Sequence, residues 1–352
     1  MTNKKISVGL LGYGYAGKTF HAPLIAGTAG LELMTIASSD AGKVHSDWPS
    51  VKVVPDPQSL FSDPSIDLIM ISTPNDTHFP LAQQALAAGK HVVVDKPFTV
   101  TVSQAQQLRQ QASEAKLLLS VFHNRRWDAD FFTLQTLLQQ GTLGEVVYFE
   151  SHMDRYRPVV RQRWREQAGP GTGLWYDLGP HLLDQAIVLF GLPQTLSLDL
   201  GQLRPSSPAA DYFHAVLGYT GRRVILHGTV LAAAETARYI VHGMHGSYIK
   251  YGMDPQEESL KAGRYAPQPD WGYDRRDGVV TLLHNDVRTE TMLPTLRGNY
   301  PGYYAAISDA IRGVAENPVP VTEAILVVAL IELGLLSYRE QKTVSVPEAE
   351  LY

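Results

Sequence analysis

The sequence contains no cysteine among its 352 residues. Disulfide bonds, thiolate nucleophiles and thiolate metal sites are therefore excluded. It also lacks a basic stretch, because 35 aspartates and glutamates outnumber 30 lysines and arginines and the net charge of −5 is spread along the chain. Nucleic-acid binding depends on clustered positive charge, so we expect no nucleic-acid partner.

Long uninterrupted apolar segments are scarce as well. The nearest candidate, 327–336, contains Glu332 and is short, so we expect no membrane-spanning segment and no membrane association. The apolar residues after the N-terminal lysines run directly into a glycine turn and lack the cleavage pattern of a signal peptide. With the absence of cysteine, this predicts a cytoplasmic protein.

The first third of the chain alternates between short apolar runs and helical patterns. The runs are 6–11, 33–37, 51–54, 67–72, 91–94 and 117–121, and the predicted helices are 16–25, 79–88 and 103–116. This alternation predicts an α/β fold with a doubly wound parallel sheet, whose ligands bind beyond the carboxyl ends of the strands. The loops at those ends are 12–17, 38–43, 72–78 and 95–98.

The pattern changes after residue 121. A helix is predicted over 128–140, closing helices over 303–313 and 322–337, and strands over 145–152, 196–200, 212–219, 223–231 and 238–242. Short glycine-containing turns between strands favour a mostly antiparallel sheet with one face covered by helices. Residues 253–278 show no periodicity and are predicted to be an irregular loop. We therefore predict two domains: a nucleotide-binding domain over 1–121 and an α+β substrate-binding domain over 122–352, with its C-terminal helices packed back on the first.

Three glycines, Gly12, Gly14 and Gly17, form a G-x-G-x-x-G pattern between the first strand and the first helix. In a dinucleotide-binding turn the first glycine permits the tight turn, the second lets the backbone approach the pyrophosphate, and the third packs the helix on the strand. The pattern alone is weak evidence, because it can arise by chance. Its position at the end of a strand and the start of a helix strengthens the prediction. The alternative is a structural turn without a ligand.

The end of the second strand indicates which dinucleotide is preferred. An NAD-binding domain usually places an acidic residue at this tip to bind the ribose 2′-hydroxyl. Here Ser38 and Ser39 occupy the tip, Asp40 follows them, and Lys43 lies close by. Small hydroxyls leave room for a 2′-phosphate that Lys43 could neutralise, so we favour NADP. Because Asp40 is acidic and lies close to this tip, NAD remains the alternative cofactor.

Two further loops carry groups suited to a cofactor and a substrate. Thr73 and Asn75 follow the fourth strand and can form hydrogen bonds with a nucleotide. Lys96 follows the fifth strand, where an unpaired lysine is unusual unless it is functional. An exposed loop lysine is the alternative.

Asp177 and His181 are four residues apart in "GTGLWYDLGPHLLDQAIVLFG", so on a helix they share one face. Histidine is the natural general base near neutral pH, and Asp177 could orient it. A buried histidine bonded to a neighbouring aspartate is the alternative. A metal role has little support because no third ligand stands at a convincing spacing, so no metal site is predicted.

The motifs together resemble one family. "GYGYAG", "TPNDTH", "AGKHVVVDKP" and "YDLGPHLLDQ" occur in the order and at the separations of the glucose–fructose oxidoreductase/inositol dehydrogenase/MocA (Gfo/Idh/MocA) family, over nearly the whole chain. Asp95 departs mildly from the usual Glu-Lys-Pro. "LLSVFHNRRWDADF", "RYRPVVRQRWRE" and "SYIKYGMDPQEESLKAGR" resemble its NADP-dependent scyllo-inositol dehydrogenase branch.

The resemblance implies an N-terminal Rossmann domain, an open sheet in the second domain that packs against a partner subunit in a homodimer or homotetramer, and hydride transfer between a nicotinamide cofactor and a hydroxyl. It implies that Lys96 orients substrate and nicotinamide, that Asp177 and His181 are the acid–base pair, and that Pro97 follows a cis peptide bond. The candidate cofactor contacts are Gly12, Tyr13, Gly14, Ala16, Gly17, Ser38, Ser39, Lys43, Thr73, Pro74, Asn75, His78, Asp95, Lys96, Trp164 and Arg165.

The expected substrate is a small cyclic polyol or sugar, most simply scyllo-inositol and its ketone. Besides Lys96, Asp177 and His181, the polar candidates for its pocket are His123, Asn124, Arg126, Asp154, Arg155, Tyr156, Arg157 and Tyr176. Because Arg155 and Arg157 are positively charged, an acidic sugar is an alternative substrate. Three alternatives remain: a reductase of another ketosugar or anhydro-sugar, a non-catalytic nucleotide-binding regulator, and a zinc-dependent polyol dehydrogenase.

Overall fold

The computed structural model describes residues 4–347, which divide into two compact units. The first unit holds the chain up to Trp127 together with 255–271 and 299–325, and the second holds 128–254, 272–298 and the chain from 326 onward. The chain first passes from the first unit to the second after Trp127, six residues beyond the predicted boundary at residue 121. Two later segments, 255–271 and 299–325, belong to the first unit again. Periodicity in a sequence indicates the type of an element but not the core that it joins, so the sequence-based boundary places these two segments in the second domain.

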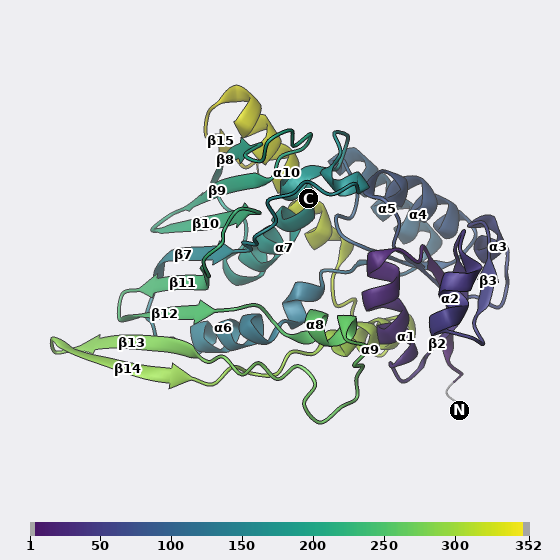
Figure 1. Ribbon diagram of the computed structural model, residues 1–352, viewed down its shortest axis with the longest axis horizontal. Coiled ribbons are helices and arrows are strands. Elements are labelled where there is room, and N and C mark those ends of the chain that lie inside the picture. The colour runs from purple at the N-terminus through teal and green to yellow at the C-terminus, as the bar shows by residue number, and fades with distance from the viewer. Residues whose placement is uncertain (1–3, 348–352) are drawn as a thin grey trace. The chain divides into compact units, whose positions relative to one another are not determined.

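The first unit contains a six-stranded parallel sheet in the order β3-β2-β1-β4-β5-β6 (Figure 1). Its strands are β1 Ile6–Leu11, β2 Leu31–Ala37, β3 Lys52–Val54, β4 Leu68–Ile71, β5 His91–Val94 and β6 Leu119–Val121. Every residue of β1 and β4 is buried, as expected for strands covered on both faces. The predicted doubly wound parallel sheet is confirmed. The strand order reverses between β1 and β4, which is where such folds bind ligands.

The helices of the first unit begin and end at recognisable signals. They are the π-helical turn η1 Gly17–His21, α1 Ala22–Ala26, α2 Ala41–Asp47, α3 Gln58–Phe61, the 3-10 turn η2 Asn75–Thr77, α4 His78–Ala87, α5 Val102–Ala115, the 3-10 turn η3 Asn124–Trp127, α8 Gln256–Lys261 and α9 Tyr300–Ile311. A reciprocal capping box between Thr101 and Gln104 starts α5, and Lys116 ends it in a left-handed conformation. The sequence analysis overlooked α2, α3 and α8, which are seven residues long or shorter.

The second unit is built on a nine-stranded sheet in the order β14-β13-β12-β11-β7-β10-β9-β8-β15. Its strands are β7 Val146–His152, β8 Thr195–Gly201, β9 Tyr212–Tyr219, β10 Arg222–Thr229, β11 Ala237–Gly243, β12 Gly246–Tyr251, β13 Gly278–His284, β14 Val287–Leu293 and β15 Val344–Ser345. Among these described strands β7 and β10 pair in parallel and the other neighbours pair antiparallel, so the predicted mostly antiparallel sheet is confirmed.

Helices cover one face of this sheet. They are α6 Ala129–Gln139 and α7 Gly173–Phe190, and Figure 1 shows both on the same side of the strands. Burial alternates strictly along β9, and its buried residue Phe213 stacks edge-on with Trp175 of α7 at 5.1 Å between ring centroids. The opposite face of β7, β9 and β10 carries half-buried polar side chains.

The helix α10, Val321–Glu340, is long and apolar enough by length and composition to cross a membrane. The expectation that no segment reaches this length is therefore wrong. It considered only the run 327–336, whereas the helix extends beyond both ends of that run. Residues 324–331 are all buried within the fold, and the carbonyl oxygen of Ile331 accepts a hydrogen bond from the indole of Trp175 at 3.2 Å. These contacts are those of a core helix, a class that also passes the length and composition test.

Candidate active site

The glycine turn joins β1 to the first helical turn in the conformation that the pattern predicts. Gly12 has φ of +97°, and a Cβ there would lie 2.4 Å from the carbonyl oxygen of Ser72. A Cβ on Gly17 would lie 2.1 Å from the carbonyl oxygen of Gly12. By contrast, nothing lies within 4 Å of the Cβ position of Gly14. The first and third glycines are therefore required by packing, and the second leaves open space beside its backbone.

The end of β2 supplies small hydroxyls and a lysine. Asp40 is engaged as the N-cap of α2: its carboxylate accepts the backbone N–H of Lys43 at 2.9 Å, and its own N–H donates to the hydroxyl of Ser38 at 3.2 Å. Lys43 donates from Nζ to the carbonyl oxygen of Tyr13 in the glycine turn at 3.0 Å. Ser38, Ser39 and Lys43 thus lie at the same edge of the sheet as the glycine turn.

Tyr13 is fixed by α2 as well. It is buried, and its hydroxyl donates to the carboxylate of Asp47 at 2.8 Å. Burial chiefly, with the hydrogen bond and charge of Asp47, raises the pKa of Tyr13 far above its usual range. Lys18 pairs with the same carboxylate at 2.7 Å. Tyr13 therefore holds the glycine turn in place through its side chain, and Ala16 follows within the helical turn that opens beyond Gly14.

His78 ties two loops of this edge together. Its Nδ1 lies 2.8 Å from the carbonyl oxygen of Pro97, and its Nε2 lies 3.0 Å from the carbonyl oxygen of Thr73. The hydroxyl of Thr73 also contacts that of Thr77 at 2.6 Å. Asn75 is buried and Pro74 is exposed beside it. The structure thus places His78 behind the loop after β4, where it links that loop to the one after β5.

Lys96 stands two residues after the end of strand β5, and both Asp95 and Lys96 are buried. The backbone N–H of Lys96 donates to the Asp95 carboxylate at 2.7 Å, and the other carboxylate oxygen lies 3.4 Å from Nε2 of His21. Nδ1 of His21 in turn lies 2.7 Å from the hydroxyl of Tyr304. The Lys96–Pro97 peptide bond is cis, as the family resemblance implies. Asp95 therefore acts on the backbone of Lys96.

The segment after β6 contributes buried polar residues. His123 and Asn124 are buried, and Asn124 begins the turn η3. Arg126 forms an ion pair with Glu323 at 2.6 Å, so its guanidinium is engaged within the first unit. These three residues stay candidates for substrate contact.

In the second unit Asp177 and His181 lie one turn apart on α7, whose segment 173–186 is buried except at Asp177. Trp164 and Arg165 belong to the 3-10 turn η4 Trp164–Glu166, which contacts α7. The guanidinium of Arg165 stacks on the indole of Trp164 at 4.9 Å and lies 3.8 Å from the carboxylate of Asp177. The structure therefore brings the Trp-Arg pair and the predicted acid–base pair together within one unit.

A pocket adjoins Asp177, lined also by Arg163, Arg165, Arg204 and Asp211. Glu166, also in its lining, accepts Nε of Arg163 at 2.6 Å and pairs with Arg204 at 3.0 Å. Burial chiefly, with the charge of Glu332, raises the pKa of the neighbouring Tyr176 to about 12, so its hydroxyl stays protonated. Each of the three arginines pairs with an acidic residue of the same lining, so the pocket is polar and balanced in charge.

Asp154, another candidate for substrate contact, lies two residues beyond the end of β7. Its carboxylate accepts the hydroxyl of Thr236 at 2.8 Å and the backbone N–H of Thr229 at 3.2 Å, and it lies between two histidine rings. Tyr156, by contrast, is 60% exposed and pairs with Leu231 through an isolated bridge. Burial, with the charges of Arg155 and two further arginines, lowers the pKa of Arg157.

A bound dinucleotide fits the carboxyl edge of the parallel sheet. The open space at Gly14 admits a pyrophosphate to the backbone, and the turn leads directly into helical N–H groups that favour anions. Ser38, Ser39 and Lys43 lie where the adenosine ribose is bound in such folds. The residues present therefore suit a nicotinamide dinucleotide.

Fold and turn together define a dinucleotide-binding oxidoreductase with a separate α/β domain. Residues 6–123 match the family model described as "Oxidoreductase family, NAD-binding Rossmann fold", and residues 135–346 match that described as "Oxidoreductase family, C-terminal alpha/beta domain". The chain belongs to the Gfo/Idh/MocA family of oxidoreductases, as its motifs indicated.

Named relatives and solved structures agree with this assignment. The oxidoreductase YdgJ of Escherichia coli is 66% identical over 96% of this chain and 98% of its own length. The scyllo-inositol 2-dehydrogenase (NADP(+)) IolW of Bacillus subtilis is 39% identical over 96% of this chain and 95% of its own. An oxidoreductase structure from Yersinia pestis, YPO2259, is 71% identical with a TM-score of 0.94 over 97% of both chains.

Sequence reasoning missed the residues that support the site from behind. His21 and Tyr304, which complete the chain of contacts to Asp95, lie in the first helical segment and in α9, far apart in the sequence. A histidine in an otherwise apolar helix face just after the glycine turn was the available signal. Arg204, which lines the pocket at Asp177, follows β8 in a segment without recognisable periodicity.

Proposed function

We propose that the protein is an NADP-dependent dehydrogenase or reductase that interconverts a secondary hydroxyl and a ketone on a cyclic polyol or sugar, with scyllo-inositol and its ketone as the favoured pair. The observation that carries the proposal is the buried Lys96 after β5, held by Asp95, in a chain whose α7 presents Asp177 and His181 one turn apart. A regulator that only binds nucleotide has no use for these groups.

Each side chain has a role in this proposal. The ammonium group of Lys96 donates to the substrate oxygen and stabilises the negative charge that develops there during oxidation. His181 accepts the hydroxyl proton at its imidazole and returns it during reduction. Asp177 orients that imidazole and is itself oriented by Arg165. The bound nicotinamide supplies the hydride acceptor or donor.

The preference for NADP rests on the end of β2. Asp40 is engaged in capping α2, so its carboxylate is occupied by the backbone of Lys43. Two serine hydroxyls and one ammonium group remain at the tip, a set that suits a phosphate better than a bare ribose hydroxyl. IolW, 39% identical to this chain, is named as an NADP(+)-dependent enzyme.

The substrate class has support from several relatives. IolW is named for scyllo-inositol. A D-glucoside 3-dehydrogenase of Escherichia coli and a 1,5-anhydro-D-fructose reductase of Ensifer adhaerens are 26% and 27% identical over about half of this chain. All three names describe a hydroxyl or carbonyl group on a sugar or a cyclic polyol.

A panel assay tests the proposal. Inositols with NADP+ or NAD+, and inososes, ketosugars and anhydro-sugars with the reduced cofactors, are followed by the absorbance of the reduced nicotinamide. We expect turnover of scyllo-inositol and of its ketone, with the higher kcat/KM for the phosphorylated cofactor. Cofactor binding without turnover of any panel member would contradict the proposal and favour a regulatory protein.

A sugar acid is the second candidate substrate. Burial and the charges of Arg155, Arg161 and Arg163 lower the pKa of Arg157, and such a cluster of guanidinium groups suits a carboxylate. The same panel therefore includes uronic and aldonic acids. A higher kcat/KM for an acid than for the neutral sugar of the same configuration would select this class.

We also propose that copies of the chain associate through the face of the nine-stranded sheet that α6 and α7 leave uncovered, and that the protein acts in the cytoplasm without membrane or nucleic-acid partners. The half-buried alternation of β7, β9 and β10 on that face supports association. Sedimentation velocity of the purified protein tests it, and a dimer or tetramer is expected.

A further inference from the structure

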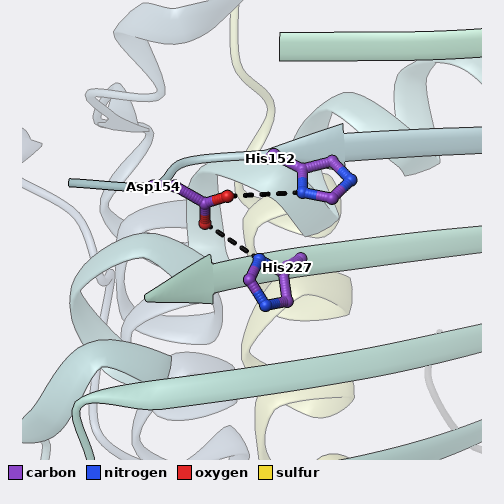
Figure 2. A group of neighbouring side chains, drawn as sticks. All are labelled: His152, Asp154 and His227. Carbon is purple, nitrogen blue, oxygen red and sulfur yellow. Dashed lines mark hydrogen bonds and ion pairs between the residues drawn. The ribbon is translucent and has the colours of Figure 1, made fainter. Parts of the chain in front are cut away.

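A cluster of two histidines and one aspartate lies where β7 and β10 end. The parallel register of these strands pairs His227 with His152, and their rings lie 5.1 Å apart between centroids. Asp154, two residues beyond His152, points to the same face of the strand. Figure 2 shows its carboxylate between the two rings. Strand pairing therefore brings His227 beside His152 and Asp154, although His227 lies 73 residues from Asp154 in the sequence.

The three groups converge on one point. One ligand atom from each residue lies within 4.8 Å of the other two. Nδ1 of His227 lies 2.8 Å from one oxygen of Asp154, and Nδ1 of His152 lies 3.5 Å from the other. Thr229 and Thr236 fix the orientation of this carboxylate through hydrogen bonds. The pairing of β7 with β10 thus fixes the two histidines, and two hydrogen bonds fix the aspartate.

His152 is arranged as metal-binding histidines commonly are. Its Nε2 forms a hydrogen bond with the carboxylate of Glu150 at 2.7 Å, while its buried Nδ1 faces the carboxylate of Asp154 at 3.5 Å. A carboxylate on the far ring nitrogen fixes the tautomer and leaves the near nitrogen for a metal ion. Glu150 and His152 both belong to β7, which makes this arrangement rigid.

We propose that His152, Asp154 and His227 form a binding site for a divalent transition-metal ion such as Zn²⁺, with Nδ1 of each histidine and a carboxylate oxygen as ligands. Two imidazoles and one carboxylate suit Zn²⁺ and its neighbours, whereas Ca²⁺ and Mg²⁺ prefer an all-oxygen set. An ion at Nδ1 of His227 takes the place of the hydrogen bond between this nitrogen and Asp154, and the neutral ring then carries its hydrogen on Nε2.

The site is separate from the proposed hydride-transfer residues of the second unit and lies on the sheet face through which copies of the chain are proposed to associate. In the single chain both histidine side chains are 17% exposed, which gives an ion a path of entry before association, and three protein ligands leave a position for water. Asp177 and His181 lie on α7, which packs on the other face of this sheet. We therefore assign the ion a structural role, in which it fixes the end of β7 where the segment leading to Trp164 begins.

Titration of the full chain with Zn²⁺ tests the site. After treatment with a chelator, Zn²⁺ binding is measured near neutral pH in competition with a chromophoric chelator. We expect one ion per chain, binding weakened by at least ~10²-fold in His227→Gln, and a ~10–100-fold loss in Glu150→Gln, the range found for outer-shell partners. His242→Gln is the matched control, because His242 lies on the neighbouring strand β11 and is bonded to Ser247 instead. Mg²⁺ and Ca²⁺ should not compete.

Two results would overturn the proposal. The first is the absence of saturable Zn²⁺ binding by the wild-type chain, and the second is equal affinity in the wild type, His152→Gln and His227→Gln. X-ray absorption of the Zn²⁺-loaded wild type keeps the test independent of how the variants fold. Two imidazole ligands at ~2.0–2.1 Å are expected, and a shell of oxygen ligands alone would exclude the site.

Discussion

The carboxylate of Asp40 accepts a hydrogen bond from the backbone N–H of Lys43 at 2.9 Å and thereby caps helix α2. The same turn leaves the ammonium group of Lys43 at the carbonyl oxygen of Tyr13, beside the glycine turn. The residue that the sequence offers as a ribose ligand is therefore used for helix capping, and the neighbouring cation stays at the edge where a dinucleotide binds.

This relationship predicts the cofactor preference. Lys43→Gln should lower kcat/KM for the phosphorylated cofactor by about tenfold or more, because one charge-assisted hydrogen bond to a phosphate is lost. The kcat/KM for the unphosphorylated cofactor should change little, because that cofactor has no 2′-phosphate for Lys43 to bind. Steady-state kinetics with both cofactors provide the measurement. Equal losses for the two cofactors would show that Lys43 acts only on the glycine turn.

The three glycines should behave differently on substitution. Gly17→Ala should lower the free energy of unfolding by about 3 kcal/mol, since its Cβ would lie 2.1 Å from a backbone oxygen and the turn must shift. Gly14→Ala should leave stability within about 0.5 kcal/mol of the wild type, because its Cβ meets nothing within 4 Å. Urea unfolding measures both changes.

The same pair of variants tests where the pyrophosphate lies. Gly14→Ala should weaken NADPH binding by at least about tenfold in a fluorescence titration, because the methyl group occupies the approach to the backbone. If Gly14→Ala kept full affinity, the cofactor would not approach the turn at this residue.

The parallel sheet was predictable because its strands are buried on both faces. Runs such as 91–94 and 6–11 were placed at their observed limits, since a continuous apolar run bounded by glycine or a charged residue marks a buried strand. The second sheet was predicted less completely. Strand β14 is exposed along almost its whole length and shows no inward-facing apolar residues, so no alternation marks it.

One local signal for that hairpin was present. Asn285 and Asp286 join β13 to β14 with φ of +49° and +61°, the backbone of a tight hairpin turn that favours these residues. The sequence analysis instead relied on alternation of apolar residues, which an exposed hairpin does not require.

The candidate sites likewise fall into those marked by local motifs and those formed only by the tertiary fold. Gly12, Lys96 and His181 stand in local motifs, so residue type and spacing made them candidates. The cluster of His152, Asp154 and His227 was not predictable, because its members become neighbours only through the register between β7 and β10. The expectation that no metal site is present rested on spacing along the chain, which does not report strand pairing.

The proposed acid–base roles predict specific losses. Lys96→Ala and His181→Ala should each lower kcat by ~10²-fold or more, the usual scale for a lost acid–base group, with little change in cofactor affinity. Lys52→Ala is the matched control for the lysine, because Lys52 is exposed on β3 and pairs only weakly with Asp63 at 3.5 Å. Near-normal turnover in either active-site variant would contradict its assigned role.

His78 should act through the loops that it joins. His78→Phe removes both contacts, to the carbonyl oxygens of Thr73 and Pro97, and leaves the buried carbonyl oxygen of Pro97 and the half-buried one of Thr73 without this partner. We expect a loss of about 1–3 kcal/mol in the free energy of unfolding. The loss of kcat should exceed any change in KM for substrate, because Pro97 adjoins Lys96. A stability loss with unchanged kcat would limit His78 to a structural role.

The stability of the second unit should depend on pH through His152. Burial disfavours its charged form, but hydrogen bonds and charges from Asp154 and Glu150 outweigh burial and raise the pKa of His152 above 6.5. The pKa values of both carboxylates are lowered, and that of the nearby His214 is lowered too, chiefly by burial. The native state therefore stabilises the protonated form of His152 relative to the unfolded state.

A group whose native pKa is raised contributes its full stability below the unfolded pKa and loses it as pH rises through the native value. The difference in Tm between the wild type and His152→Gln should therefore be largest below about pH 6.5 and shrink as the pH rises above it. The measurement is made in chelator, so that a bound ion does not compete with the proton, and with His242→Gln as the control. A difference that is constant across this window, or that grows as pH rises, would contradict the charge assigned to His152.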